Sequence, residues 1–237
     1  MNLVIWILFL VSLGGDTEAK VKSFHIQYKG SLSCDGESVV YLDMRNYSAK
    51  DVATCKKKDS IVMAYVSSQY ESWRDDAKLF GKKEKGKDLD DWQGEKWINP
   101  KSKKVKEIMI ARIAKAKAMG FQGMDFDNTD FYHFKTGFDN SKKAAIKYAQ
   151  FLIDETHKQG MFYSLKNTMD LIKNLKRVDY YQNESCHKYK ECDVYDDVKA
   201  PVFIIEYKRC PSRRKRYKKA YTVRKKGSMT PKARICR

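Results

Sequence analysis

The chain lacks the histidine and cysteine spacings of a metal site. Its four histidines, His25, His133, His157 and His187, are scattered along 237 residues. No combination of these histidines with the cysteines has the spacing of a zinc site. We therefore predict no metal site, and expect the six cysteines to serve another purpose.

Two further absences narrow the function. No glycine-rich phosphate loop is present to support a doubly wound, nucleotide-binding sheet. The net charge is +18, which attracts anionic polymers and lipid headgroups, but no nucleic-acid recognition motif accompanies it. We expect no specific nucleic-acid partner, and regard an anionic matrix or surface as the partner that the basic exterior favours.

Long apolar runs are also missing, except at the start. Residues 2–13 are almost purely apolar, and Thr17-Glu18-Ala19 places small residues where a signal peptidase cuts. The run is too short to span a bilayer, and no second candidate follows. We predict a signal peptide over 1–19, a secreted protein, and one domain over 20–237; an uncleaved anchor is the alternative.

Six cysteines in a secreted chain are most simply three disulfides. Cys186 and Cys192 are close enough to close one loop, and we predict that bridge. Cys34–Cys55 and Cys210–Cys236 are the simplest remainder, although spacing alone does not choose among the pairings.

Strand patterns alternate with helical patterns through most of the chain. Helical stripes cover 103–119 and the segment around 145–156, and shorter helices are expected at 48–57 and 169–176. Such alternation predicts parallel strands, and about eight of them fit a small, trimmed (β/α)8 TIM-type barrel. A doubly wound open sheet is the alternative. The predicted strands are 23–28, 39–43, 61–67, 123–127, 161–167, 180–184, 202–207 and 220–223.

Nearly every predicted strand turns polar at its last residue. In a barrel these ends share one rim, which is where catalysis occurs. Counting with a period of two along each strand, we expect a set of inward-facing side chains at that rim. The set is Asp43, Tyr65, Ser67, Asp125, Asp127, Lys166, Glu184 and Glu206.

Ionising five carboxylates and one ammonium in one cavity would cost much free energy, because the carboxylates repel one another. Some carboxyl pKa values should rise, and one beside Lys166 should fall. Carboxyl groups whose pKa values differ in this way supply an acid and a nucleophile or base, as glycoside hydrolysis requires. The alternative is a structural metal or ion-pair site, for which the deeper Asp125 is the best candidate.

Residues 68–101 show no clear period and are interpreted as a long functional loop. The loop carries Trp73, Trp92 and Trp97. These rings are expected either to stack on sugars or to form the loop's own small core.

Several segments in order resemble the endo-α-1,4-polygalactosaminidases, glycoside hydrolase family 114. They are Tyr65-Val66-Ser67, Tyr70-Glu71-Ser72-Trp73-Arg74, Trp92-Gln93-Gly94-Glu95-Lys96-Trp97, the strand from Gly123 to Asp130, Leu165-Lys166-Asn167, Asn183-Glu184-Ser185-Cys186, Glu191-Cys192 and the strand from Val202 to Tyr207. The resemblance implies a TIM-type barrel that cleaves α-1,4-linked galactosamine or N-acetylgalactosamine chains internally, with no cofactor. The chain departs from the family pattern at Arg45, at Ser68-Gln69-Tyr70 and at Asp125-Phe126.

The resemblance also assigns roles. Asp127 is expected to be the nucleophile of a retaining mechanism and Glu184 the general acid/base. We expect Lys166 to keep Asp127 ionised, and Glu206 to raise the pKa of Glu184 by crowding it. The expected substrate-binding residues are Asp43, Tyr65, Trp73, Trp92, Asp125, Asn128, Asp130, Lys166, Asn167, Glu206 and Tyr207.

A second interpretation is a barrel without efficient turnover that binds glycan or an anionic surface. The basic run from Arg213 to Lys219 would then provide the binding surface. The high positive charge also favours a neutral, acetylated polymer over a cationic one as substrate. In either case we expect a monomer.

Overall fold

The computed structural model describes residues 21, 23–90, 92–207, 209–212, 220–225 and 233–236; for 220–225 and 233–235 it gives the backbone alone. The predicted signal peptide over 1–19 and the basic run from Arg213 to Lys219 lie outside these residues.

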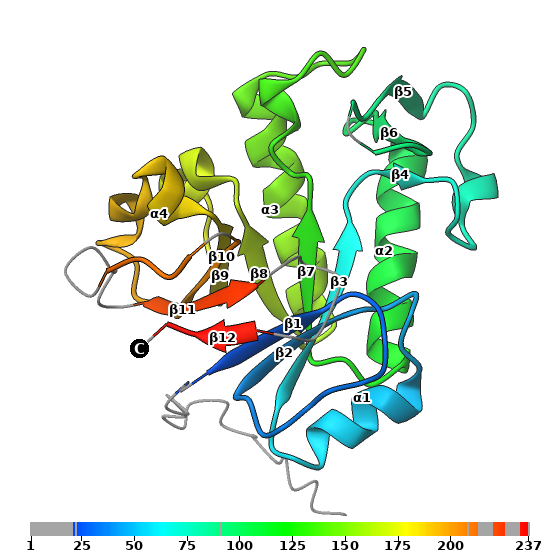
Figure 1. The fold of residues 1–237 in the computed structure, drawn as a ribbon. Coiled ribbons are helices and arrows are strands. Elements are labelled where there is room, and N and C mark those ends of the chain that lie inside the picture. Colours follow the sequence, from blue (N-terminus) through cyan, green and yellow to red (C-terminus); the bar gives the residue numbers. More distant parts are fainter. Residues whose placement is uncertain are drawn as a thin grey trace, which may run out of the picture.

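A nine-stranded sheet forms the centre of the molecule, in the order β1-β2-β3-β7-β8-β9-β10-β11-β12. All neighbouring pairs are parallel except β11 and β12. The sheet curls into a nearly closed barrel (Figure 1), which confirms the trimmed TIM-type fold. The strands are β1 Phe24–Gln27, β2 Val39–Asp43, β3 Ile61–Ser67, β7 Gly123–Asp127, β8 Phe162–Lys166, β9 Tyr180–Glu184, β10 Val202–Glu206, β11 Ala220–Lys225 and β12 Ala233–Ile235.

Serine caps begin the crossover helices. Ser48, Ser102 and Ser141 each accept a backbone N–H at the start of α1 (Ala49–Lys56), α2 (Lys103–Ala118) and α3 (Lys142–Lys158). A 3-10 turn η2 (Phe131–His133) precedes α3 in the same connection. The next two crossovers hold only shorter elements: the 3-10 turn η3 (Met169–Asn174) between β8 and β9, and the four-residue helix α4 (Cys186–Tyr189) with the 3-10 turn η4 (Cys192–Tyr195) between β9 and β10. These short connections explain how about eight strands fit in so small a chain.

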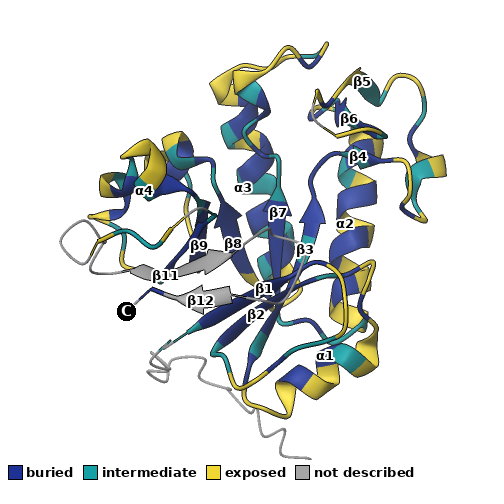
Figure 2. Cartoon of the chain, viewed as in Figure 1, coloured by how far each residue is buried: buried dark blue, intermediate teal, exposed yellow. Residues whose placement is uncertain are grey.

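Alternate residues of the strands serve two different cores. Inside the barrel, Ile26, Tyr41, Met63, Phe203 and Ile205 belong to one buried cluster. Their neighbours along the strands face outward and pack against the helices in a second, larger cluster. Strands β1, β2, β3 and β7 to β10 are therefore largely buried on both faces, as Figure 2 shows by their mainly dark blue colour.

The prediction of a structureless loop over 68–101 was wrong. This segment folds into an antiparallel sheet, in the order β4-β6-β5, with a 3-10 turn η1 (Ala77–Leu79) after β4. Its strands are β4 Tyr70–Glu71, β5 Lys85–Asp88 and β6 Glu95–Ile98. They are too short to show an alternating pattern. The small sheet lies beyond the end of β3 (Figure 1).

Gln69 fastens this small sheet to the barrel. Its side-chain Oε1 accepts from the Ile98 backbone N–H at 3.0 Å, and its Nε2 donates to the Asn128 carbonyl at 2.8 Å. Because Gln69 is fully buried, both bonds are shielded from water. The sheet is thus a fixed wall beside the end of β7.

Three disulfides are present, Cys34–Cys55, Cys186–Cys192 and Cys210–Cys236. They confirm the predicted Cys186–Cys192 bridge and the simplest pairing of the other four cysteines. In the described part of the chain, no helix has the length and apolar character needed to cross a membrane.

Candidate active site

Three charged side chains meet where β7, β8 and β9 end. Lys166 Nζ lies 2.7 Å from Asp127 Oδ2 and 2.8 Å from Glu184 Oε2. Burial disfavours the ammonium charge, but the two carboxylates outweigh it and hold the pKa of Lys166 well above its usual value. One buried cation therefore bridges the two acids that the sequence singled out.

Three polar side chains orient the two acids. The Tyr65 hydroxyl donates to Asp127 Oδ2 at 2.8 Å, and the Tyr207 hydroxyl donates to Glu184 Oε1. Asn167 accepts from the Glu184 backbone N–H at 2.9 Å, and its Nδ2 donates to Glu184 Oε2 at 3.4 Å. Both carboxylates therefore accept hydrogen bonds from donors that fix their orientation.

Glu206 does not face the inside of the barrel, where Asp127, Lys166 and Glu184 meet. This corrects the prediction that it belongs to the inward-facing set. On β10 the inward residues are Phe203 and Ile205, so Glu206 projects outward, where its Oε1 accepts from the His187 backbone N–H at 3.0 Å. The error is one of register, because a shift of one residue reverses the face. The next residue, Tyr207, occupies the inward position.

The pKa of Glu184 is accordingly lowered, not raised by crowding from Glu206 as predicted. Burial acts to raise it, but the charge of Lys166 and hydrogen bonds from Lys166, Tyr207 and Asn167 outweigh burial. Glu184 is therefore held as a carboxylate in the resting protein.

Asp125 lies one layer deeper in the barrel, with no exposed surface. Burial raises the pKa of Asp125 to about 7, although the Ser164 hydroxyl and the Lys166 charge oppose the shift. Its complete burial leaves no surface for a substrate to contact. Asp125 is thus a neutral acid below the site in mildly acidic solution.

A second cluster of acidic side chains lies at the end of β2 and in the neighbouring small sheet. Asp43 Oδ1 lies 3.6 Å from Arg74 Nη2, and the same guanidinium binds Glu71 with two nitrogens. Glu95 on β6 stands opposite Glu71 in the small sheet. Burial first, and then the charges of Glu71 and Asp127, raise the pKa of Glu95 to about 8.

Sequence reasoning did not choose Glu71, Arg74 or Glu95 as site residues. All three lie in the segments that carry the family resemblance, so the resemblance was the available signal. Local pattern gave none, since the strands β4 and β6 are too short to show a period.

The turn after β7 carries two other predicted residues. Asn128 adopts a left-handed backbone (φ 60°), and its Nδ2 donates to Ser67 Oγ at 3.1 Å. Asp130 is partly buried, and burial followed by the charge of Asp127 raises its pKa. Asn128 therefore shapes the turn, while Asp130 adds a further acid beside Asp127.

Comparisons with known proteins agree with this geometry. Residues 15–233 match glycoside-hydrolase family GH114. The chain belongs to this family. It is a glycoside hydrolase.

Two solved structures show the same fold. The crystal structure of Aspergillus fumigatus Ega3 in complex with galactosamine is 30% identical, with a TM-score of 0.81, over 90% of this chain and 94% of that one. The glycoside hydrolase domain of PelA from Pseudomonas aeruginosa is 15% identical, with a TM-score of 0.69, over 88% and 94%. No curated protein matches the chain.

The tryptophans of this GH114 chain divide between the two predicted uses. Trp97 is buried and stacks on Phe134, with ring centroids 5.0 Å apart. Trp73 and Trp92 are 37% and 56% exposed. Trp97 therefore belongs to the core of the small sheet, and the other two remain available for sugar stacking.

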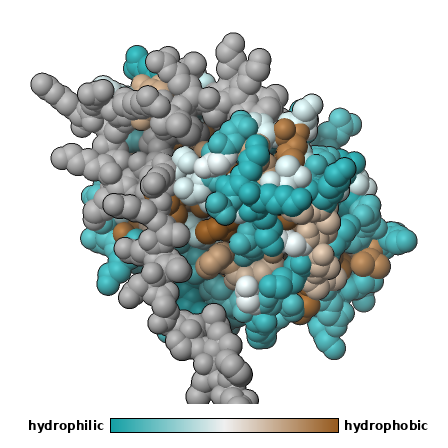
Figure 3. Space-filling model, turned by 90° about the horizontal axis from the view of Figure 1, so that it is seen from below, coloured by the Kyte–Doolittle hydropathy of each residue, from teal (hydrophilic) through white to brown (hydrophobic). Residues whose placement is uncertain are grey.

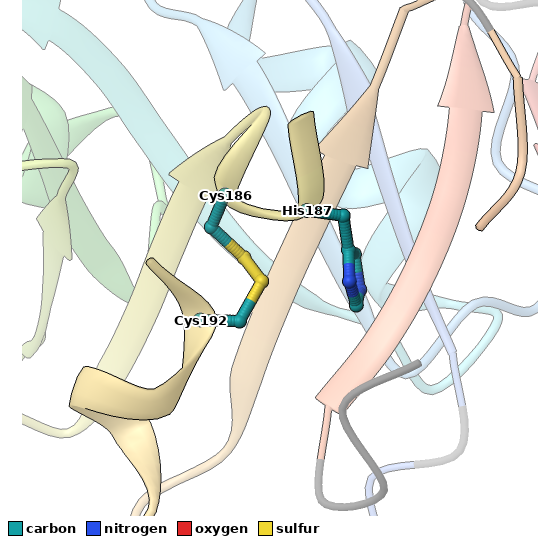
Figure 4. Close-up of side chains that lie close together, drawn as sticks. All are labelled: Cys186, His187 and Cys192. Atoms are coloured by element: carbon teal, nitrogen blue, oxygen red, sulfur yellow. A yellow bond between two sulfur atoms is a disulfide. The ribbon is translucent and has the colours of Figure 1, made fainter. Parts of the chain in front are cut away.

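One metal-like cluster occurs among the residues that the structure describes. Ligand atoms of Cys186, His187 and Cys192 lie within 4.8 Å of one another. Figure 4 shows that the two sulfur atoms are joined as a disulfide, beside the His187 ring. A metal ion requires free thiolates, so this oxidised group does not fit one, and its disulfide clips the loop directly after Glu184.

Proposed function

We propose that this GH114 chain is a secreted enzyme that cleaves galactosamine-containing polysaccharide internally, by a retaining mechanism. Asp127 is the nucleophile and Glu184 the general acid/base. Among the other residues at the mouth, Asp43, Tyr65, Asn167 and Tyr207 are placed to contact or orient the sugar.

The bridging position of Lys166 carries this proposal. Because Lys166 Nζ lies 2.7 and 2.8 Å from Asp127 and Glu184, the two bridged oxygens are at most about 5.5 Å apart, which is compatible with the roughly 5–5.5 Å between the carboxyl groups of retaining glycosidases. Inverting enzymes separate their carboxyl groups by about 6.5–9.5 Å to admit a water. The short bridge supports direct attack by a carboxylate.

The proposed reaction has two steps. In molecules whose Glu184 has taken up a proton from acidic solution, Asp127 attacks the anomeric carbon while Glu184 donates that proton to the leaving glycosidic oxygen, which gives a glycosyl ester and a free chain end. Glu184 then removes a proton from water, and the hydroxide oxygen displaces Asp127 from the same carbon. Lys166 and Tyr65 both contact Asp127 Oδ2 and fix its orientation before the attack.

Local charge supports an amino sugar as substrate, despite the positive net charge of the chain. Asp130 adds a carboxyl group beside Asp127, and the 30% identical Ega3 was crystallised with galactosamine. Carboxylates close to the sugar attract its ammonium group far more strongly than distant surface lysines repel it, because surface charges are screened beyond roughly 10 Å.

Replacing each acid by its amide tests these roles. Asp127→Asn and Glu184→Gln should each lose most of the hydrolysis of a galactosamine oligomer while the melting temperature stays near that of the parent. Glu206→Gln is the matched control, since Glu206 lies outside the cavity, and it should keep full activity. Added azide should restore Glu184→Ala with a product of retained configuration and Asp127→Ala with a product of inverted configuration; the opposite pattern would reverse the assignment. Turnover by both amide variants would move the site elsewhere on the rim.

A further inference from the structure

A separate hollow of about 810 Å³ lies on the outside of the barrel. One wall is the outer face of α3, with Lys147, Phe151 and His157. The other wall is the segment after η3, with Lys176 and Arg177. It shares none of the groups that meet at the catalytic cleft.

Hydrogen bonds hold the two walls together. Gln150 on α3 accepts from the Lys176 backbone N–H at 3.0 Å and donates to its carbonyl at 3.4 Å. Below them, His157 Nε2 lies 2.7 Å from Asp179 Oδ2, which also accepts from the backbone N–H of Tyr163 at 2.8 Å. The hollow is therefore formed before any ligand arrives, which reduces the entropy lost on binding.

Arg177 is held in an unusual backbone conformation. Its φ is 63°, in the left-handed region that non-glycine residues rarely occupy. The preceding residue is fixed to Gln150 through both backbone groups. This conformation keeps the exposed guanidinium on the rim of the hollow.

The rim is rich in cations without partners. Lys147, Lys176 and Arg177 are exposed, and within the described part of the chain no acidic side chain lies within ion-pair distance of them. Two acids also line the hollow: Glu155 is paired with the fourth cation, Lys158, at 2.6 Å, and Asp154 accepts a hydrogen bond from Gln150 at 2.9 Å. Three charges are thus free to bind anions, and a guanidinium suits sulfate or carboxylate by two parallel hydrogen bonds.

An aromatic ring lies among these cations. Phe151 is half-buried on α3, and Lys106 Nζ lies 5.3 Å from its ring centroid. Flat apolar surface next to cations is the combination that a charged sugar needs, because the ring face of the sugar covers the aromatic side chain while its acidic groups meet the cations. A simple inorganic anion would leave the ring unused.

The hollow and the cleft are at different places on the barrel. The catalytic groups stand at the C-terminal ends of β7, β8 and β9, whereas the His157–Asp179 pair lies next to the starts of β8 and β9. Figure 1 shows α3 running along the outside between these two ends. Figure 3, viewed from below, shows a surface in which hydrophilic residues predominate among the described part.

We propose that this hollow binds an anionic polysaccharide carrying sulfate or uronate groups. It holds the enzyme on an acidic matrix while the cleft, at the other end of the barrel, remains open for a different chain. The inference goes beyond hydrolysis and does not depend on it, and it gives a defined place to the anionic partner that the net charge predicts.

Charge-matched variants of the mature chain test the proposal. One variant combines Lys147→Gln, Lys176→Gln and Arg177→Gln. The control combines Lys50→Gln, Lys57→Gln and Lys83→Gln, three exposed lysines elsewhere. Both lose the same net charge, so they separate a site from a general attraction. The probe is a heparin hexasaccharide, which carries both sulfate and carboxylate groups, at an ionic strength of about 0.15 M, where long-range attraction is largely screened.

We expect the dissociation constant to rise at least tenfold in the first variant and less than twofold in the control. Turnover of a galactosamine oligomer should be unchanged in both, and equal melting temperatures would show that both are folded. Equal weakening in the two variants would mean that only net charge matters, and would overturn the proposal. Unchanged binding in the first variant would also overturn it, whether or not the enzyme is active.

Discussion

Replacing Tyr207 tests which groups set the pKa of Glu184, the proposed general acid. Its hydroxyl donates to Glu184 Oε1 and is one of the groups that lower the pKa of Glu184. Tyr207→Phe removes this donor and leaves the ring. Because the lost bond stabilises only the ionised carboxylate, the pKa of Glu184 must rise.

The size of the effect follows from the bond. A hydrogen bond to a charged group contributes about 1.5–3 kcal/mol, and each pKa unit corresponds to about 1.4 kcal/mol. Tyr207 is partly exposed, so the lower end applies, and the pKa of Glu184 should rise by about one unit. A general acid works only when protonated, so activity falls as pH rises through the pKa of Glu184.

The assay is kcat/KM against pH on a galactosamine oligomer. The parent should be most active in acid, and the falling limb should move about one pH unit upward in Tyr207→Phe. Tyr189→Phe, at a 59% exposed position, serves as control and should leave the limb in place. An unmoved limb in Tyr207→Phe, or one moved toward acid, would refute Glu184 as the group that limits activity.

Two other predictions concern stability and modification. The pKa of Asp125 is raised to about 7 in the fold, so its ionisation costs stability progressively as pH rises from about 4 to 7. Asp125→Asn should therefore gain roughly 4 kcal/mol relative to the parent between pH 4 and pH 8, measured by urea unfolding; a pH-independent difference would contradict this. Asn183 should carry no glycan although it lies in a sequon, since it is 1% exposed and bonded to the Cys186 backbone, whereas the exposed Asn46 is the expected acceptor. Intact-mass analysis after expression in a secretory host would show this, and full occupancy at Asn183 would disagree with the packing.

The barrel could be predicted because its signals are local. Apolar stripes and runs such as Ile61–Ser67 predicted helices and strands with bounds close to those observed. The convergence of Asp127, Lys166 and Glu184 followed from one rule, that parallel strands end at one rim. The Lys166 contact with Asp127 was expected for the same reason.

Other features depend on information that a local pattern does not carry. The inward parity of β10 requires the register with β9, so Glu206 was placed inside and Tyr207 was not recognised as the donor to Glu184. The small antiparallel sheet pairs residues far apart in the chain, and its strands are too short to alternate visibly. The lowered pKa of Glu184 depends on Lys166, which contacts both Asp127 and Glu184. The sequence alone does not show that one lysine contacts both acids.

The shared ammonium has a consequence for the whole reaction. In the proposed first step Asp127 loses its charge as it forms the ester, and Glu184 gains a charge as it gives up its proton. One negative charge thus passes from β7 to β9, while Lys166, at 2.7 and 2.8 Å, is already in contact with both positions. The counterion need not move, and little dipole reorganisation is required as the charge is relocated. The barrel therefore presents the same net charge to the sugar before and after the bond is broken.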